Sequence, residues 1–183
     1  HEIEKWDETG TSSVWVNVPQ INASSTTDYI WMYYNHPSAV DSQNATSTWN
    51  SNYVGVWHMS ETPDADGGTD EILDSTSNNN DGDSQNMATY DQVSGQIDGS
   101  LEFANGSNRV EVGTPASLNN ITEKTISAWI KVGDSTSDGR IFAKETNTSV
   151  DPGWDFLLPS DERLIYRSRF TGGFGQWQYT TPL

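Results

Sequence analysis

Short runs in which apolar and polar residues alternate constrain the fold of this chain more than any other feature of its sequence. The clearest run is Thr125–Val132, where Ile126, Ala128, Ile130 and Val132 share one face of an extended segment. Turns rich in Gly, Asn, Asp and Ser separate such runs, as in proteins built from many short strands. The pattern predicts an all-β protein, a sandwich or jelly roll.

The predicted strands span most of the chain. One helix is predicted within Asp41–Trp49, although its Ser, Thr and Asn content suits a helix interior poorly. The strands are Val14–Val18, Tyr29–Tyr34, Val54–Met59, Ser100–Phe103, Arg109–Val112, Thr125–Val132, Arg140–Lys144, Asp155–Leu158, Arg163–Phe170 and Gln176–Tyr179.

Aromatic residues make a core feasible in a chain of 183 residues of which only 33% are hydrophobic. Eight Trp, seven Tyr and five Phe each bury a large surface. The absence of cysteine does not exclude export, because a sandwich of this size folds without disulfides. We expect Trp57 and Trp129, which lie in patterned strands, to be core residues.

The charge is strongly acidic, with 26 Asp and Glu against nine Lys and Arg, a formal net charge of −17. No Lys or Arg lies between Lys5 and Arg109. Such a surface repels phosphate backbones, so nucleic acid is not an expected partner.

No apolar run has the length of a membrane span. Five glycosylation sequons support an extracellular origin weakly; they begin at Asn22, Asn44, Asn105, Asn120 and Asn147.

Three N-terminal segments carry a family resemblance. The strand E-I-E-K-W-D (Glu2–Asp7), the strand V-W-V-N-V-P (Val14–Pro19) and the strand and turn Y-I-W-M-Y-Y-N-H-P-S-A (Tyr29–Ala39) resemble the C-terminal part of the domain of unknown function 2341 family. Asn35-His36 stands where that family usually has Gly-Asn. The resemblance predicts a small, partial β unit over residues 1–53, without the family's opening strands.

A second resemblance begins at Val54. The segments V-G-V-W-H-M-S-E (Val54–Glu61), I-L-D-S-T-S-N-N-N-D-G (Ile72–Gly82), S-G-Q-I-D-G-S-L-E-F (Ser94–Phe103) with R-V-E-V (Arg109–Val112), and T-I-S-A-W-I-K (Thr125–Lys131) resemble, in order, the laminin-G-like group of concanavalin A-like domains. The resemblance implies a jelly-roll sandwich over residues 54–183 that lacks its last strands. The predicted fold class is therefore an incomplete concanavalin A-like sandwich preceded by a small β unit.

Missing strands would leave sheet edges open. We expect the edges at Val14–Val18 and Arg163–Tyr179 to be covered by another copy, another chain or further residues of a parent protein.

Calcium is the cofactor that the acidic, Asn-rich segment between Glu61 and Asp83 suggests, because hard cations prefer several oxygen ligands. The expected ligands are Asp74, Asn78 and Asn80, in a loop that the laminin-G resemblance implies to be structured. The segment does not fit an EF-hand, since Ser75 stands twelfth from Asp64. The alternative is a hydrogen-bonded turn without metal.

Exposed aromatic rings near glycine-rich loops are the candidates for carbohydrate binding. The expected residues are Trp154, Trp177 and Tyr179, with Phe174 nearby. The alternative is that these rings pack in the core, as most aromatic side chains do.

No catalytic residues are predicted. The paired-carboxylate strand of some concanavalin A-like glycosidases is absent, although Glu2, Glu4 and Asp7 approach its spacing. The alternative chemistry is a copper site built on the N-terminal amine of His1 with His36 and His58, since such a set of nitrogen ligands can bind copper.

The sequence therefore favours a non-catalytic adhesion or glycan-binding module at a cell surface or in a secreted protein. The expected partner is a glycan or a surface protein. One alternative is a structural subunit of an extracellular filament, assembled by strand complementation. The other is an accessory domain of a polysaccharide-degrading enzyme.

Overall fold

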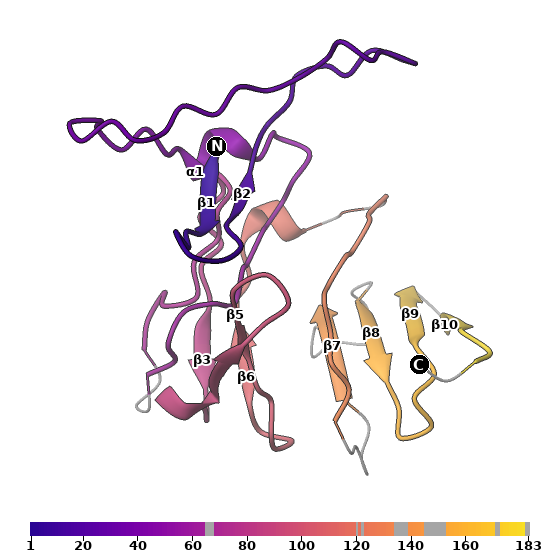
Figure 1. Ribbon diagram of the computed structural model, residues 1–183. Coiled ribbons are helices and arrows are strands. Elements are labelled where there is room, and N and C mark those ends of the chain that lie inside the picture. Colours follow the sequence, from indigo (N-terminus) through magenta and orange to yellow (C-terminus); the bar gives the residue numbers. More distant parts are fainter. Residues whose placement is uncertain are drawn as a thin grey trace. The chain divides into compact units, whose positions relative to one another are not determined.

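A computed structural model of the chain describes residues 1–64, 68–119, 121, 123–133, 139–144, 153–170 and 173–181 (Figure 1). Within these residues the protein is all-β, with ten strands, one short α-helix and two 3-10 helices. Every strand pair is antiparallel. The all-β prediction is confirmed.

The chain divides into two compact units, residues 1–126 and 127–183. We call them the first and second unit and describe each by itself. The division predicted at residue 53 does not coincide with this one, and it stays a prediction.

The first unit contains three two-stranded sheets. The pairs are β1 (Glu2–Lys5) with β2 (Ser13–Trp15), β3 (Asp83–Gln85) with β6 (Arg109–Glu111), and β4 (Gln92–Ser94) with β5 (Gly99–Leu101). The 3-10 helices are η1 (Thr89–Asp91) and η2 (Ala116–Leu118).

The single α-helix, α1 (Ala45–Thr48), is one turn long and lies inside the predicted segment. It begins where it does because the Asn44 side chain accepts a hydrogen bond from the Ser47 N–H at 3.0 Å, as an N-cap residue does. The Ser- and Thr-rich sequence does not extend the helix further.

The core of the first unit is small. Ile72, Met87 and Leu101 are buried, and Trp57 and Val110 are among the partly buried residues that pack against them. The expectation that Trp57 belongs to the core is confirmed.

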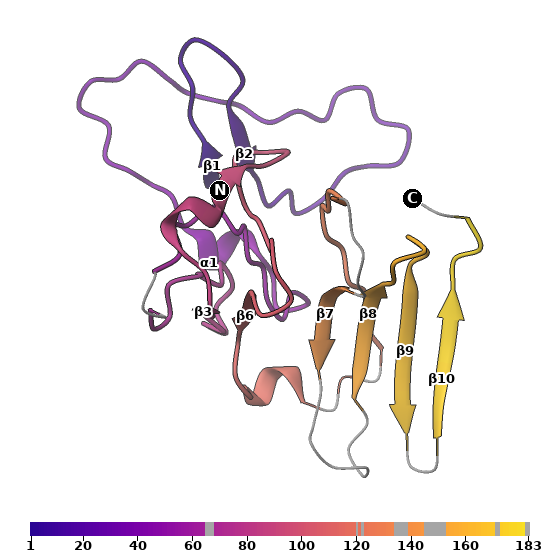
Figure 2. The same cartoon turned by 90° about the horizontal axis from the view of Figure 1, so that it is seen from below.

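The described residues of the second unit form one four-stranded sheet in the order β10-β9-β8-β7 (Figures 1 and 2). Trp154, Leu157 and Ile165 are buried in it. Opposite residues in antiparallel strands share a face, so the registers place Trp177 of β10, Tyr166 of β9 and Phe156 of β8 on one face. The strands are β7 (Gly139–Lys144), β8 (Trp154–Leu158), β9 (Ile165–Phe170) and β10 (Gly173–Gln178).

Three predicted strands are not formed, and the prediction is wrong for each of them. Val54–Met59 has only an isolated antiparallel bridge, between Trp57 and Asp74. Tyr29–Tyr34 lies in the long connection between β2 and α1, which has neither helix nor strand (Figures 1 and 2). In Thr125–Val132, Ile126 and Val132 are half-buried but Ala128 and Ile130 are exposed, so the predicted buried face does not exist. The Trp129 side chain is 76% exposed, so the expectation that it is a core residue is wrong. Alternation makes a strand possible, but a strand also needs a neighbour for its backbone N–H and C=O groups.

Candidate functional site

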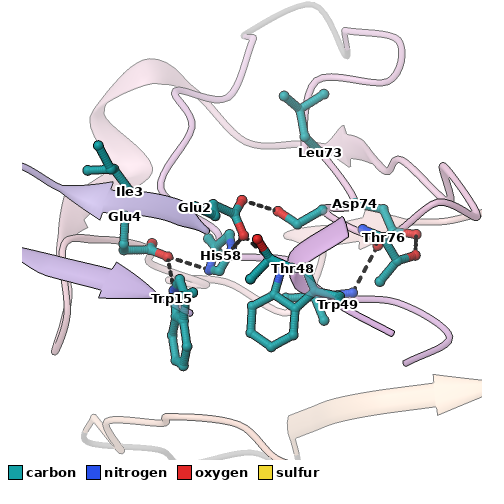
Figure 3. A network of polar contacts seen from close by, with 12 residues as sticks. Glu2, Ile3, Glu4, Trp15, Thr48, Trp49, His58, Leu73, Asp74 and Thr76 are labelled. Atoms are coloured by element: carbon teal, nitrogen blue, oxygen red, sulfur yellow. Dashed lines mark hydrogen bonds and ion pairs between the residues drawn. The ribbon is translucent and has the colours of Figure 1, made fainter. Parts of the chain in front are cut away.

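A cluster of carboxylates, indoles and one imidazole joins β1 to the segment around His58 (Figure 3). Glu2 and Glu4 are two residues apart on β1, so their side chains lie on the same face of the strand. The Glu4 carboxylate oxygen Oε2 lies 2.5 Å from His58 Nδ1 and accepts a hydrogen bond from Trp15 Nε1 at 2.7 Å. Glu2 Oε2 accepts from Trp49 Nε1 at 2.7 Å, and Glu2 Oε1 accepts from the Ser75 hydroxyl at 2.6 Å.

The His58 ring is enclosed by this cluster. Only 14% of its side chain is exposed, and 4% of the Glu4 side chain. The ring stacks near Trp15, with centroids 5.9 Å apart and planes at 29°, and lies 6.1 Å from the Trp49 ring. His58 Nε2 is 3.3 Å from Glu2 Oε2 but makes no hydrogen bond.

The geometry favours a structural clamp over a metal centre. Glu2 and Glu4 face different nitrogens of the His58 ring, so the three side chains do not converge on one ion. Across the described ranges, no group of three or more His, Asp or Glu side chains is placed to hold a metal. The enclosed cluster links β1, β2, α1 and the segments around His58 and Ser75. We call its residues the clamp; they are Glu2, Glu4, Trp15, Trp49, His58 and Ser75.

The Asp74 loop, predicted to bind calcium, is built around one buried carboxylate. Asp74 is 5% exposed. Its Oδ1 accepts hydrogen bonds from the Val56 N–H at 2.9 Å and the Thr76 N–H at 3.0 Å. Its Oδ2 accepts from the Thr76 hydroxyl and the Asn80 N–H, both at 2.9 Å. Four donors occupy both oxygens, and this satisfies a buried carboxylate without a metal.

The two amides of the predicted calcium site are in the same loop. Asn80 Nδ2 donates to the Val54 carbonyl at 2.8 Å, and Asn80 Oδ1 accepts from the Ser117 hydroxyl at 3.0 Å. Asn78 Nδ2 also donates to the Val54 carbonyl, at 3.1 Å. The structure thus brings the three predicted residues together, in an arrangement that supports the hydrogen-bonded turn. Calcium binding stays a prediction.

The aromatic residues predicted to bind sugar differ in their exposure. Trp177 and Tyr179 are 62% and 59% exposed, at the end of β10. Trp154 is 7% exposed and stacks on Phe142, with ring centroids 5.3 Å apart and planes at 10°. Trp154 is therefore a core residue, and we leave it out of the candidate binding face.

Two exposed rings and the half-buried ring of Tyr166 form a strip across β9 and β10. Trp177 lies directly opposite Tyr166, with ring centroids 5.7 Å apart. A Cβ on Gly175 would meet the Trp177 ring at 3.0 Å, so the indole lies over this glycine. Tyr179 follows Trp177 by two residues, which in an extended chain places both on the same face. Phe174, 63% exposed, faces the opposite side of β10. We call Tyr166, Trp177 and Tyr179 the aromatic strip.

Three of the five sequon asparagines are described, and all three are exposed. Asn44 caps α1, Asn22 Nδ2 donates to Asp28 at 3.1 Å, and Asn105 Oδ1 accepts from the Ser107 N–H at 3.0 Å. Asn120 and Asn147 lie outside the described residues.

Sequence reasoning missed the clamp. The sequence presents Glu2 and Glu4 as parts of a strand motif and a near match to catalytic carboxylates, and His58 as part of a strand motif and a copper ligand. The alternation of the two glutamates on one strand is a signal that they share a partner. That this partner is His58, more than 50 positions away in the sequence, depends on the tertiary fold.

The family model for "Domain of unknown function (DUF2341)" matches residues 1–100, more than half of the chain. The chain belongs to the DUF2341 family. The match covers β1, β2 and α1, and it continues past residue 53 to include the clamp and the Asp74 loop. No curated protein and no solved structure matches the chain. In the part of the chain that the structure describes, no helix is long and apolar enough to cross a membrane.

Proposed function

We propose that this DUF2341 chain is a non-catalytic extracellular module that binds glycans through the aromatic strip. The observation that carries the proposal is the exposure of Trp177 on the outer strand β10 and of Tyr179 directly after it, 62% and 59%. Large aromatic rings that stay exposed side by side mark interaction surfaces.

The chemistry of the strip suits a sugar. A pyranose ring presents C–H groups on its faces and hydroxyl groups at its edge. Trp177 and Tyr179 offer flat apolar surfaces for the C–H groups. The Trp177 indole N–H and the Tyr179 hydroxyl are polar groups that can hydrogen-bond at the sugar's edge. Gly175 lies beside the indole and has no side chain, so no side chain projects from this position next to the ring.

The resemblance of residues 54–183 to laminin-G-like domains also supports the proposal, since that group belongs to the concanavalin A-like lectin fold. We propose that the four-stranded sheet of the second unit is one layer of such a jelly-roll sandwich. The excess of acidic residues and the sequons agree with a location outside the cell or at its surface.

Assembly into a filament by strand complementation is the second candidate. It is favoured by β10, which among the described strands pairs only with β9 and so has one open edge. An accessory domain of a polysaccharide-degrading enzyme would use the same aromatic strip, with catalysis supplied by another domain.

Affinity electrophoresis and glycan arrays test the lead proposal. Trp177→Ala and Tyr179→Ala should each abolish or strongly reduce retention by the bound polysaccharide. Phe174→Ala is the matched control, because Phe174 is equally exposed on the same strand but faces the other side. Equal loss of binding in all three variants, or retention in none of a broad panel of polysaccharides, would contradict the proposal.

A further inference from the structure

Six consecutive large apolar residues, Tyr29–Tyr34, are exposed in the first unit. Their exposed fractions run from 62% for Ile30 to 91% for Tyr33. In the described part of the chain, none of the six makes a hydrogen bond through its backbone or side chain, and only the rings of Tyr29 and Trp31 contact each other, at 5.1 Å. The segment is therefore an apolar stretch of chain with an unpaired backbone.

The composition of Tyr29–Tyr34 is that of a strand. Aromatic and β-branched residues favour pleated structure, and the six residues contain no Gly and no Pro. In an extended backbone Tyr29, Trp31 and Tyr33 point to one side, and the other three side chains point to the opposite side. Both sides are thus apolar, which suits burial in an interface better than one-sided stacking on a sugar.

The segment lacks the features that natural proteins use to block edge pairing. Such edges carry Lys, Pro, inward charges or bulges. Here no Asp, Glu, Lys or Arg occurs between Asp28 and Asp41. Two copies of the segment, running antiparallel, therefore meet without a charged side chain opposite another.

We propose that Tyr29–Tyr34 is a self-association strand, which pairs antiparallel with the same segment of a second copy of this chain. Such pairing is two-fold symmetric and uses one patch twice. Aromatic side chains have about 150–250 Å² each to bury, so the four aromatic residues of the segment, each exposed by more than 70%, offer on the order of 600 Å² per copy for an interface. This approaches the roughly 800 Å² per partner of a stable interface.

Charge sets the conditions under which pairing occurs. Residues 1–126 hold three basic and 19 acidic residues, a formal net charge of −16. Two copies repel each other at low ionic strength, and salt screens this repulsion. The proposed dimer is therefore stronger at high salt, opposite to an association held by ion pairs. The inference does not depend on glycan binding.

Sedimentation velocity over a range of protein concentrations, at low and high salt, tests the inference. We expect a dimer whose population rises with both concentration and salt. Trp31→Glu places a charge in the paired strand and should weaken the dimer about tenfold or more. Met32→Pro, which removes a backbone N–H, should also weaken it. Trp129→Glu is the matched control: its indole is 76% exposed, against 74% for Trp31, and the variant should remain dimeric.

A chain that stays monomeric at all concentrations and salt levels would overturn the inference. So would equal weakening by Trp129→Glu, or an association that Trp31→Glu and Met32→Pro leave intact. Hydrogen exchange adds an independent check. Amides of Tyr29–Tyr34 that are protected in the monomer would show that the chain itself covers the segment, and this would also overturn the inference.

Discussion

Replacing Asp74 by alanine removes the acceptor for four hydrogen bonds at once. Three of the donors are backbone N–H groups, of Val56, Thr76 and Asn80, and the fourth is the Thr76 hydroxyl. Each buried donor left without a partner costs about 1–3 kcal/mol, and water entering the vacated space recovers part of this. We expect Asp74→Ala to lower the free energy of unfolding by about 3–5 kcal/mol, which corresponds to roughly 6–20 °C in melting temperature.

Urea denaturation, followed by circular dichroism and fluorescence, measures this loss in calcium-containing buffer and again with a chelator. The hydrogen-bond account predicts the same loss in both buffers. Asp28→Ala is the matched control. Asp28 also accepts a backbone N–H, that of Asn22 at 2.7 Å, but it lies in an exposed loop, and its loss should change stability little. A destabilisation by Asp74→Ala that appears only with calcium would refute the account and establish the loop as a calcium site.

Two further predictions concern β1 and the turn after it. Glu4→Ala removes the carboxylate that His58 Nδ1 and Trp15 Nε1 face in a buried cluster, so it should lower the free energy of unfolding, measured by urea denaturation, by about 3–5 kcal/mol. Glu8→Ala is the control, because Glu8 is exposed, and it should change this free energy little. Equal effects of the two variants would contradict the clamp. The Thr9 backbone N–H, and then the Thr9 hydroxyl, hold the pKa of Asp7 below its ordinary 3.8, so this contribution to stability is present above that value and is lost as the pH falls through the lowered pKa. Thr9→Val should raise the Asp7 pKa only part of the way to 3.8 in a carboxyl NMR titration; an unchanged pKa would contradict the role of the hydroxyl.

The sequence predicted the four sheet strands of the second unit well, because they are close neighbours along the chain. The predicted strands near Arg140, Asp155, Arg163 and Gln176 correspond to β7–β10, which pair in chain order. The equally patterned Tyr29–Tyr34 forms no strand. Periodicity shows which side chains can share a face, but not whether a neighbouring strand is present to pair with it.

The sites show the same limit. Asp74, Asn78 and Asn80 are close in sequence, so the sequence places them in one loop; that the loop is structured is what the laminin-G resemblance implies. The spacing does not distinguish a metal ligand from a hydrogen-bond acceptor, since both roles use the same oxygen atoms. Trp154 and Trp177 look alike in sequence, yet one lies in an inner strand and the other in an outer strand, so only Trp177 keeps its ring exposed.

NMR observation of the tryptophan indole N–H signals during titration with a soluble polysaccharide that the chain retains tests the central claim most directly. The account predicts that the Trp177 signal shifts as the glycan is added, that the buried Trp154 signal stays in place, and that the polysaccharide is recovered uncleaved. A glycan that shifts other indoles and leaves Trp177 unchanged, or a polysaccharide that is shortened during the titration, would contradict it.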